Sequence, residues 1–249
     1  HRNLKVCIDT MFINKVELFT AIDKTIKYRS VIVIKDRTYE QYKQALANLV
    51  FVYNRGGWKV KSIHADGEFR GLLEHVETDM NIELALAAAD EHVPEAERNI
   101  RTLKETFRAH FQALPFKALP KLLIQYLALR CCWVLNIYPV KHGISDHYSP
   151  HMLLGKERLT YERHFSIPFG AHVQILDKSD NTPVARTIDA IYLRPAPRLN
   201  GGHEVMDLIT GHLVNKPGPV TVIPMTQNVI NQVNKMAYRQ GYKDLKFFN

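Results

Sequence analysis

The first 70 residues carry the pattern that most restricts the fold. Three short segments rich in Val, Ile and Phe are followed by one amphipathic helix and then by a fourth apolar segment. Three closely spaced strands predict an antiparallel meander. A helix between the third and fourth strands predicts a crossover, and therefore a parallel pairing in the same sheet. The four predicted strands are 5–10, 16–22, 29–34 and 59–63.

The predicted helix has a start signal and a stop signal of its own. Thr38 followed by Gln41 has the spacing of a capping box, in which the two side chains bond reciprocally to the first backbone N–H groups. Apolar residues at helical spacing continue to Tyr53, and Gly56-Gly57 ends the helix.

The order of elements continues beyond residue 70 and indicates a fold class. We expect a short helix over 70–78, a fifth strand over 82–87, a long helix from Glu95 to Ala113, and another from Pro120 to about Ile137. This is the order of an RNase H-like domain, an α/β fold with a mixed five-stranded sheet and flanking helices. Other mixed folds share this order of elements, so the sequence motifs must distinguish between them.

The second half of the chain has the sequence pattern of a small β domain. Short strand candidates at 171–176, 185–193, 203–208 and 219–224 are separated by turn clusters, which favours a small barrel. We expect a core domain over 1–150, a linker over 151–165, a β domain over 166–225 and a tail over 226–249. The tail is interpreted as a helix followed by a linker segment.

Composition narrows the class of partner. The formal net charge of +8, from 33 Lys and Arg against 25 Asp and Glu, favours polyanions such as nucleic acid. The chain has three cysteines, two of them adjacent, so we expect neither a disulfide framework nor a zinc finger. The most apolar stretch, 122–138, contains Gln125, Arg130 and Asn136, so we expect a buried helix and no membrane partner.

Three acidic residues stand where the predicted fold would bring them together. Asp9 ends the first strand and Asp66 ends the neighbouring fourth strand, whereas Glu97 lies in the first turns of the long helix. Carboxylates this close repel one another unless cations lie between them. Mg²⁺ prefers oxygen ligands, and Mn²⁺ would serve equally. Two such ions, roughly 4 Å apart, are suited to phosphodiester displacement.

Two of these assignments have rivals. Asp23, at the end of the second strand, competes with Asp9 for the first position. Glu95 competes with Glu97, but residues two apart on a helix point to different faces, so only one can reach the aspartates. Glu68 is interpreted as a surface or supporting acid.

Basic residues follow Glu97 along the long helix. Arg101, Lys104 and Arg108 recur at spacings of three or four and form a stripe on roughly the catalytic face. With Arg98, they are the predicted contacts to DNA. The alternative is a solvated charged face.

Two segments resemble integrases of Ty1/copia-type retrotransposons. Pro94-Glu95-Ala96-Glu97-Arg98-Asn99-Ile100-Arg101-Thr102-Leu103 is similar to the stretch around the family's catalytic glutamate. His64-Ala65-Asp66-Gly67-Glu68-Phe69 is similar to the stretch around its second aspartate, and Asp9 corresponds to the first. Two features depart from the family pattern. The interval between the second and third acids is shorter, and Pro-Glu replaces the usual Asn-Gly before Ala-Glu-Arg.

The resemblance implies a function, a second domain and partners. It implies DNA 3′-end processing and strand transfer by Asp9, Asp66 and Glu97 with two Mg²⁺ or Mn²⁺ ions, and an SH3-like domain after the core. Implied partners are element ends, target DNA, further copies of the chain and polyprotein segments such as reverse transcriptase. The implied location is the nucleus, with a cytoplasmic particle stage. The alternatives are an inactive relic that binds nucleic acid or polyprotein partners, and an RNase H-type nuclease.

Overall fold

The computed structural model describes residues 2–88, 93–141, 143–156, 158–176, 186–197 and 202–248. The chain divides into two compact units, each assembled from separate stretches. The first unit comprises residues 1–108, 128–158 and 246–249, and the second comprises 109–127 and 159–245. The domain boundaries expected from the sequence, at 150 and 166, remain a prediction.

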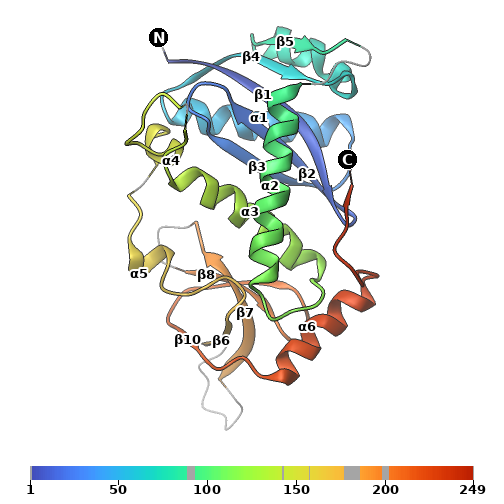
Figure 1. Ribbon diagram of the computed structural model, residues 1–249, viewed down its shortest axis with the longest axis vertical. Helices are drawn as coiled ribbons and strands as arrows, with labels where there is room; N and C mark the ends of the chain where they lie inside the picture. The colour runs from blue at the N-terminus through green and yellow to red at the C-terminus, as the bar shows by residue number, and fades with distance from the viewer. Residues whose placement is uncertain are drawn as a thin grey trace. The chain divides into compact units, whose positions relative to one another are not determined.

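The first unit contains the predicted mixed sheet, with strand order β3-β2-β1-β4-β5 (Figure 1). Strands β1, β2 and β3 form the antiparallel meander, whereas β4 is parallel to both β1 and β5. This mixed sheet with flanking helices fits an RNase H-like core. The strands are β1 (Asn3–Ile13), β2 (Val16–Asp23), β3 (Arg29–Ile34), β4 (Lys59–Ala65) and β5 (Glu83–Leu86).

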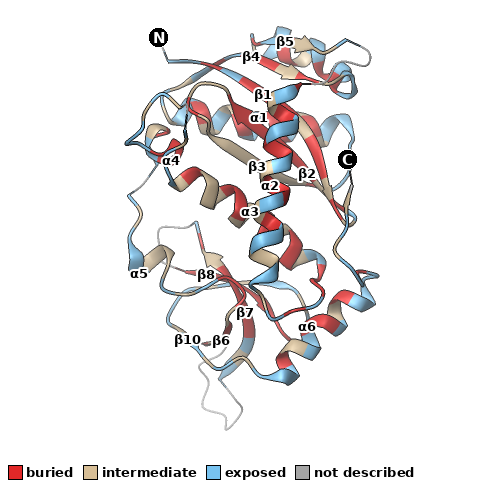
Figure 2. Ribbon diagram, viewed as in Figure 1, coloured by how far each residue is buried: buried red, intermediate tan, exposed pale blue. Residues whose placement is uncertain are grey.

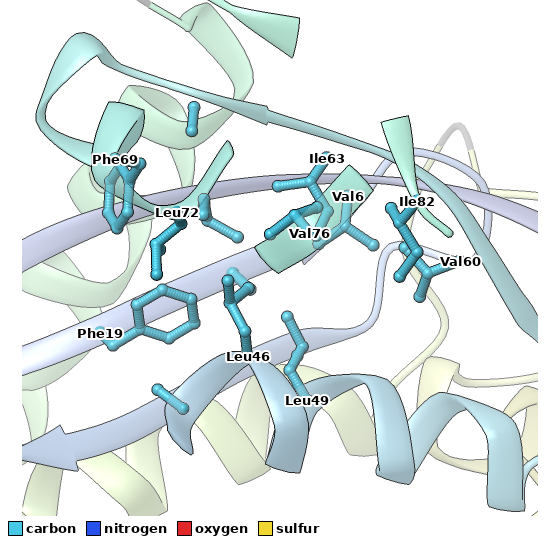
Figure 3. Close-up of a cluster of buried hydrophobic side chains, with 14 of the residues drawn as sticks. Val6, Phe19, Leu46, Leu49, Val60, Ile63, Phe69, Leu72, Val76 and Ile82 are labelled. Carbon is cyan, nitrogen blue, oxygen red and sulfur yellow. The ribbon is translucent and has the colours of Figure 1, made fainter. Parts of the chain in front are cut away.

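Helix α1 (Tyr39–Arg55) covers one face of this sheet and supplies its main core. Leu46 and Leu49 are buried and pack against side chains from β1, β2 and β4, as Figure 3 shows. Excluding this apolar area from water is the main favourable term for the unit. The cluster also contains Val6, Phe19, Val60, Ile63, Phe69, Leu72, Val76 and Ile82.

Helix α2 (Pro94–Gln112) begins on the opposite face, where Ala96 packs with Cys7 and Ile22. Side chains alternate along a strand, so the α1 face of β1 receives Leu4, Val6 and Ile8, and the α2 face receives Cys7 and Asp9. The pleat of β1 therefore directs Asp9 toward the helix that carries Glu97.

The second half of helix α3 (Lys121–Ile137), from residue 128, also belongs to the first unit. Asn136 bonds to both backbone groups of Arg29 at 2.8 Å, which fixes this part of α3 to β3. Leu127, Ala128 and Cys131 are buried, as predicted for the apolar stretch. Figure 2 shows α3 coloured mostly as buried or intermediate. In the part of the chain that the structure describes, none of the helices combines the length and apolar character needed to cross a membrane.

Three local predictions were wrong. Thr38 makes no side-chain cap, because its hydroxyl donates to Asp36, while the side-chain oxygen of Gln41 accepts from the N–H of Lys35. The helix expected over 70–78 is two short turns, a 3₁₀ turn at Gly67–Leu72 and a π-helical turn at His75–Asp79. Strand β1 runs on to Ile13, so Asp9 lies within it and not at its end.

The second unit is built on a five-stranded antiparallel sheet of order β10-β6-β7-β8-β9. Its core contains Val173, Ile175, Ala190, Tyr192 and Val205. Strand β9 had no counterpart in the sequence-based prediction. The strands are β6 (His172–Leu176), β7 (Thr187–Pro195), β8 (His203–Asp207), β9 (Leu213–Lys216) and β10 (Val220–Val222), and the unit also contains the helices α5 (Tyr161–His164) and α6 (Gln227–Arg239).

The end of the chain departs from the expected linker. Beyond α6, strand β11 (Phe247–Phe248) pairs antiparallel with the end of β1, with Phe247 opposite Ile13. The backbone N–H of Asn14 also donates to the carbonyl of Lys246 at 2.6 Å. This short strand makes residues 246–248 part of the first unit.

Candidate functional site

Asp9 and Asp66 are brought together by the register of two parallel strands. Strand β1 pairs with β4 as far as Cys7 opposite His64, and Asp9 and Asp66 stand two residues further along the two segments. After Ala65 the chain leaves β4 and turns into the 3₁₀ helix, with Asp66 as the residue before its first turn. Both aspartates are half-buried.

Glu97 reaches the same place from the start of α2. The N–H groups of Ala96 and Glu97 donate to the carbonyl of Val93, which closes the first turn of the helix. A carboxylate is favoured in this turn because the helix dipole leaves partial positive charge at the N-terminus. The side chain of Glu97 is exposed.

The three acids line one cavity of about 840 Å³ in the first unit. Four charged residues of α2 line it as well, together with one aromatic side chain from the end of the chain. The described lining residues are Asp9, Thr10, Asp66, Glu97, Ile100, Arg101, Lys104, Glu105, Arg108 and Phe247. The structure thus gathers six of the seven predicted site residues. Arg98 is exposed on α2 and is not among these lining residues.

The surroundings of Asp9 disfavour the ionised form of its carboxyl group. The pKa of Asp9 is raised from 3.8 to about 6, chiefly by burial and also by the neighbouring charges of Asp66, Glu68 and Glu97. The N–H of Thr10, which donates to Asp9 Oδ1 at 2.6 Å, acts in the opposite direction. Folding therefore holds an acid in a place where a cation would stabilise its charged form.

The donor set fits a hard divalent cation. All three converging side chains are carboxylates, the ligands that Mg²⁺ and Mn²⁺ favour. The described residues contain no group of three His, Cys, Asp or Glu side chains already close enough to hold one ion together. We therefore expect the carboxylates to draw closer when the ion binds, because their mutual repulsion then disappears.

The rival acids have other contacts. Asp23 is fully buried and accepts from the N–H groups of Thr25 and Ile26 at 2.7 and 2.5 Å, which makes it the anchor of the turn after β2. Burial raises its pKa to about 6. Glu95 forms an ion pair with Lys24 at 3.5 Å.

Glu68 supports Asp9 from the other face of β1. Its Oε1 accepts from the Thr10 hydroxyl at 2.9 Å, and that hydroxyl lies 3.0 Å from the hydroxyl of Tyr42 on α1. Glu68 also forms an ion pair with Arg37 at 3.9 Å. Because the backbone N–H of Thr10 bonds to Asp9, this network fixes the residue that orients the first aspartate.

Basic residues of α2 line the same cavity as the acids. Lys104 is 7% exposed, and desolvation lowers its pKa while Asp9 raises it. Arg101 and Arg108 are exposed, and Arg108 forms an ion pair with Glu105. Positive charge beside a carboxylate cluster is an arrangement that suits a polyanion approaching bound metal.

Sequence reasoning missed four of the described residues that line the cavity, namely Thr10, Ile100, Glu105 and Phe247. Thr10 follows Asp9 directly in the sequence, so its nearness to the site could have been inferred. Its hydrogen bonds to Glu68 and Tyr42 could not, because they depend on how α1 and the 3₁₀ turn pack. Phe247 lies at the other end of the chain, and only the pairing of β11 with β1 brings it to the site.

The comparisons with known proteins give a structural match at low identity. No family model matches this chain, and no curated protein matches it. One similar solved structure is the catalytic core domain of BIV integrase, at 18% sequence identity and a TM-score of 0.45. The match covers 60% of this chain and 92% of that one. At this identity the likeness concerns the course of the backbone alone.

Replacing Asp9 by Asn should stabilise the protein at pH 7.5. The raised pKa means that the folded state loses stability as the pH rises from 3.8 through 6. The neutral amide avoids this loss, which is about 1 kcal/mol after allowance for solvent screening, or a melting temperature higher by about 2–4 °C. Differential scanning calorimetry at pH 7.5 and at pH 3.5 measures the effect.

The low-pH scan is the control, because at pH 3.5 the native side chain is itself mostly protonated and the two proteins should melt nearly together. An Asp9→Asn protein that is less stable than the wild type at pH 7.5 would contradict this electrostatic account of the cavity.

Proposed function

We propose that this chain is the integrase of a Ty1/copia-type retrotransposon, and that it carries out metal-dependent DNA 3′-end processing and strand transfer. The observation that carries the proposal is the cavity that Asp9, Asp66 and Glu97 line together with a row of cations from α2. Two sequence segments around Asp66 and Glu97 resemble the same family, which supports the assignment independently of the cavity.

In this proposal the three carboxylates hold two Mg²⁺ or Mn²⁺ ions. When bound, such ions polarise a phosphodiester and stabilise both the attacking and the leaving oxygen of an in-line displacement. The chain's own contribution is to fix the ligands. Thr10 orients the Asp9 carboxylate, the parallel strands set the spacing of the aspartates, and the first turn of α2 presents Glu97.

Arg101, Lys104 and Arg108 would bind the DNA backbone beside the reacting phosphodiester. They lie along one face of α2 and line the cavity with the acids. Contacts of this kind position a nucleic acid without reading its sequence. Arg98 lies outside the cavity lining, so its role as a DNA contact rests on the sequence pattern alone.

The remaining expectations from the family also belong to the proposal. We propose that the antiparallel sheet of the second unit is the SH3-like domain that follows such integrase cores. The proposed partners are element ends, target DNA, other copies of the chain and polyprotein segments such as reverse transcriptase. The proposed location is the nucleus, with a cytoplasmic particle stage.

Replacing Glu97 by Gln should abolish strand transfer. Loss of one metal ligand removes several kcal/mol of transition-state stabilisation, so the rate should fall by about a hundredfold or more. The assay is the joining of a labelled element-end duplex to plasmid DNA with Mg²⁺ or Mn²⁺. Glu95→Gln is the matched control, because this acid stands two residues away on the same helix and pairs with Lys24. It should retain the activity.

The outcomes of the same assay separate the alternatives. Equal loss in both variants would refute the assignment of Glu97, and bound DNA without joining in the wild type would favour an inactive relic. Metal-dependent cleavage confined to RNA–DNA hybrids would favour an RNase H-type nuclease.

Replacing Arg101 by Gln should weaken DNA binding in a salt-dependent way. Each phosphate contact contributes about one to the slope of log affinity against log salt concentration, so the slope should become shallower by about one. Fluorescence anisotropy of a labelled duplex from 50 to about 200 mM salt measures it. Arg55→Gln, the same change on α1 at the other face of the sheet, should leave the slope as it is. Equal slopes for both variants would place DNA elsewhere.

A further inference from the structure

The end of the chain contributes a side chain to the lining of the cavity that holds Asp9, Asp66 and Glu97. Strand β11 pairs with the end of β1, and the bond from Lys246 N to Asn14 Oδ1, at 2.7 Å, reinforces the pairing. This attachment brings Phe247 into the lining of the cavity that also holds Asp9 and Asp66. An aromatic side chain thus stands beside carboxylates, in a cavity otherwise lined mostly by charged groups.

The contacts of Phe247 fix its ring without burying it. The ring meets Phe107 edge to face, with centroids 5.9 Å apart and planes at 88°, and it is only half-buried. The guanidinium carbon of Arg108 lies 4.6 Å from the ring centroid, so a flat cationic group covers the ring. Phe107 itself is buried and gives the ring a rigid support.

Arg108 is placed so that it can leave the ring. Its side chain is 46% exposed and pairs with Glu105, one turn back on α2. Exposed ion pairs of this kind are worth little and exchange readily with solvent or with a stronger anion. A phosphate oxygen entering the cavity would attract the guanidinium, and the ring would then be available to another flat group.

We propose that Phe247 and Arg108 bind an unpaired nucleotide next to the reacting phosphodiester, with the base stacked on the Phe247 ring and the guanidinium on the phosphate. This inference rests on the proposed function and names its substrate more closely. Aromatic rings bind bases in this way with little regard to sequence. A base inside a duplex has both faces covered by its neighbours, so the bound nucleotide must be single-stranded or frayed from a duplex end.

The test uses the full chain and a DNA duplex that carries one unpaired 2-aminopurine nucleotide at its 3′ end. The fluorescence of 2-aminopurine falls when the base stacks. Ca²⁺ replaces Mg²⁺, because its larger and irregular coordination suits binding better than catalysis. The variants are Phe247→Leu, which keeps the apolar bulk beside Phe107, and Phe247→Trp, which keeps a stacking face. A fully paired duplex of the same sequence is the control substrate.

The wild type and Phe247→Trp should quench the unpaired base. Phe247→Leu should leave it bright and bind the overhang duplex about tenfold more weakly, while all three proteins bind the fully paired duplex alike. Thermal unfolding of each variant verifies that the fold is retained. Absence of quenching in the wild type, or equal quenching by Phe247→Leu, would overturn the proposal.

Failure of this inference is distinguishable from failure of the proposed function. Strand transfer that depends on Glu97 and proceeds unchanged in Phe247→Leu would remove the stacking role and leave the integrase intact. A wild type that binds neither duplex would overturn both.

Discussion

Repulsion among three carboxylates, two half-buried and one exposed, is the constraint on which the site depends. The fold does not reduce this repulsion, because the register of β1 and β4 sets Asp9 and Asp66 side by side and α2 adds Glu97. The cost appears in the pKa of Asp9, which burial and the neighbouring acids raise to about 6. This arrangement lowers the stability of the folded protein, and divalent cations bound between the carboxylates would restore it.

The cavity draws its walls from stretches that are far apart in the chain. Strand β1 contributes an aspartate on the α2 face and core residues on the α1 face, so one pleated strand serves both site and core. Thr10, also on the α1 face, ties the site to Glu68 and Tyr42. Strand β11 then adds Phe247 from the end of the chain. The cavity and its supporting contacts therefore combine residues from both faces of the sheet and from the chain end.

The mixed sheet and the cluster of acids could be predicted from the sequence, because strand alternation and helix spacing are local patterns. The interactions of Thr38 could not, since Asp36 competes for the hydroxyl that a capping box would use. Strand β1 continues past its predicted end at Thr10, because pairing with β2 extends it to Ile13. Phe247 had no local signal at all, and a two-residue strand is fixed only by the partner it pairs with.

The central claim is that Asp9, Asp66 and Glu97 form one metal centre. A crystal structure of the protein with Mn²⁺, with the ions located by their anomalous scattering, tests it most directly. The account predicts Mn²⁺ at the cavity, coordinated by oxygens of all three carboxylates, which should lie closer together than they do without metal. Saturating Mn²⁺ that leaves the cavity empty, or that binds without Glu97, would contradict it.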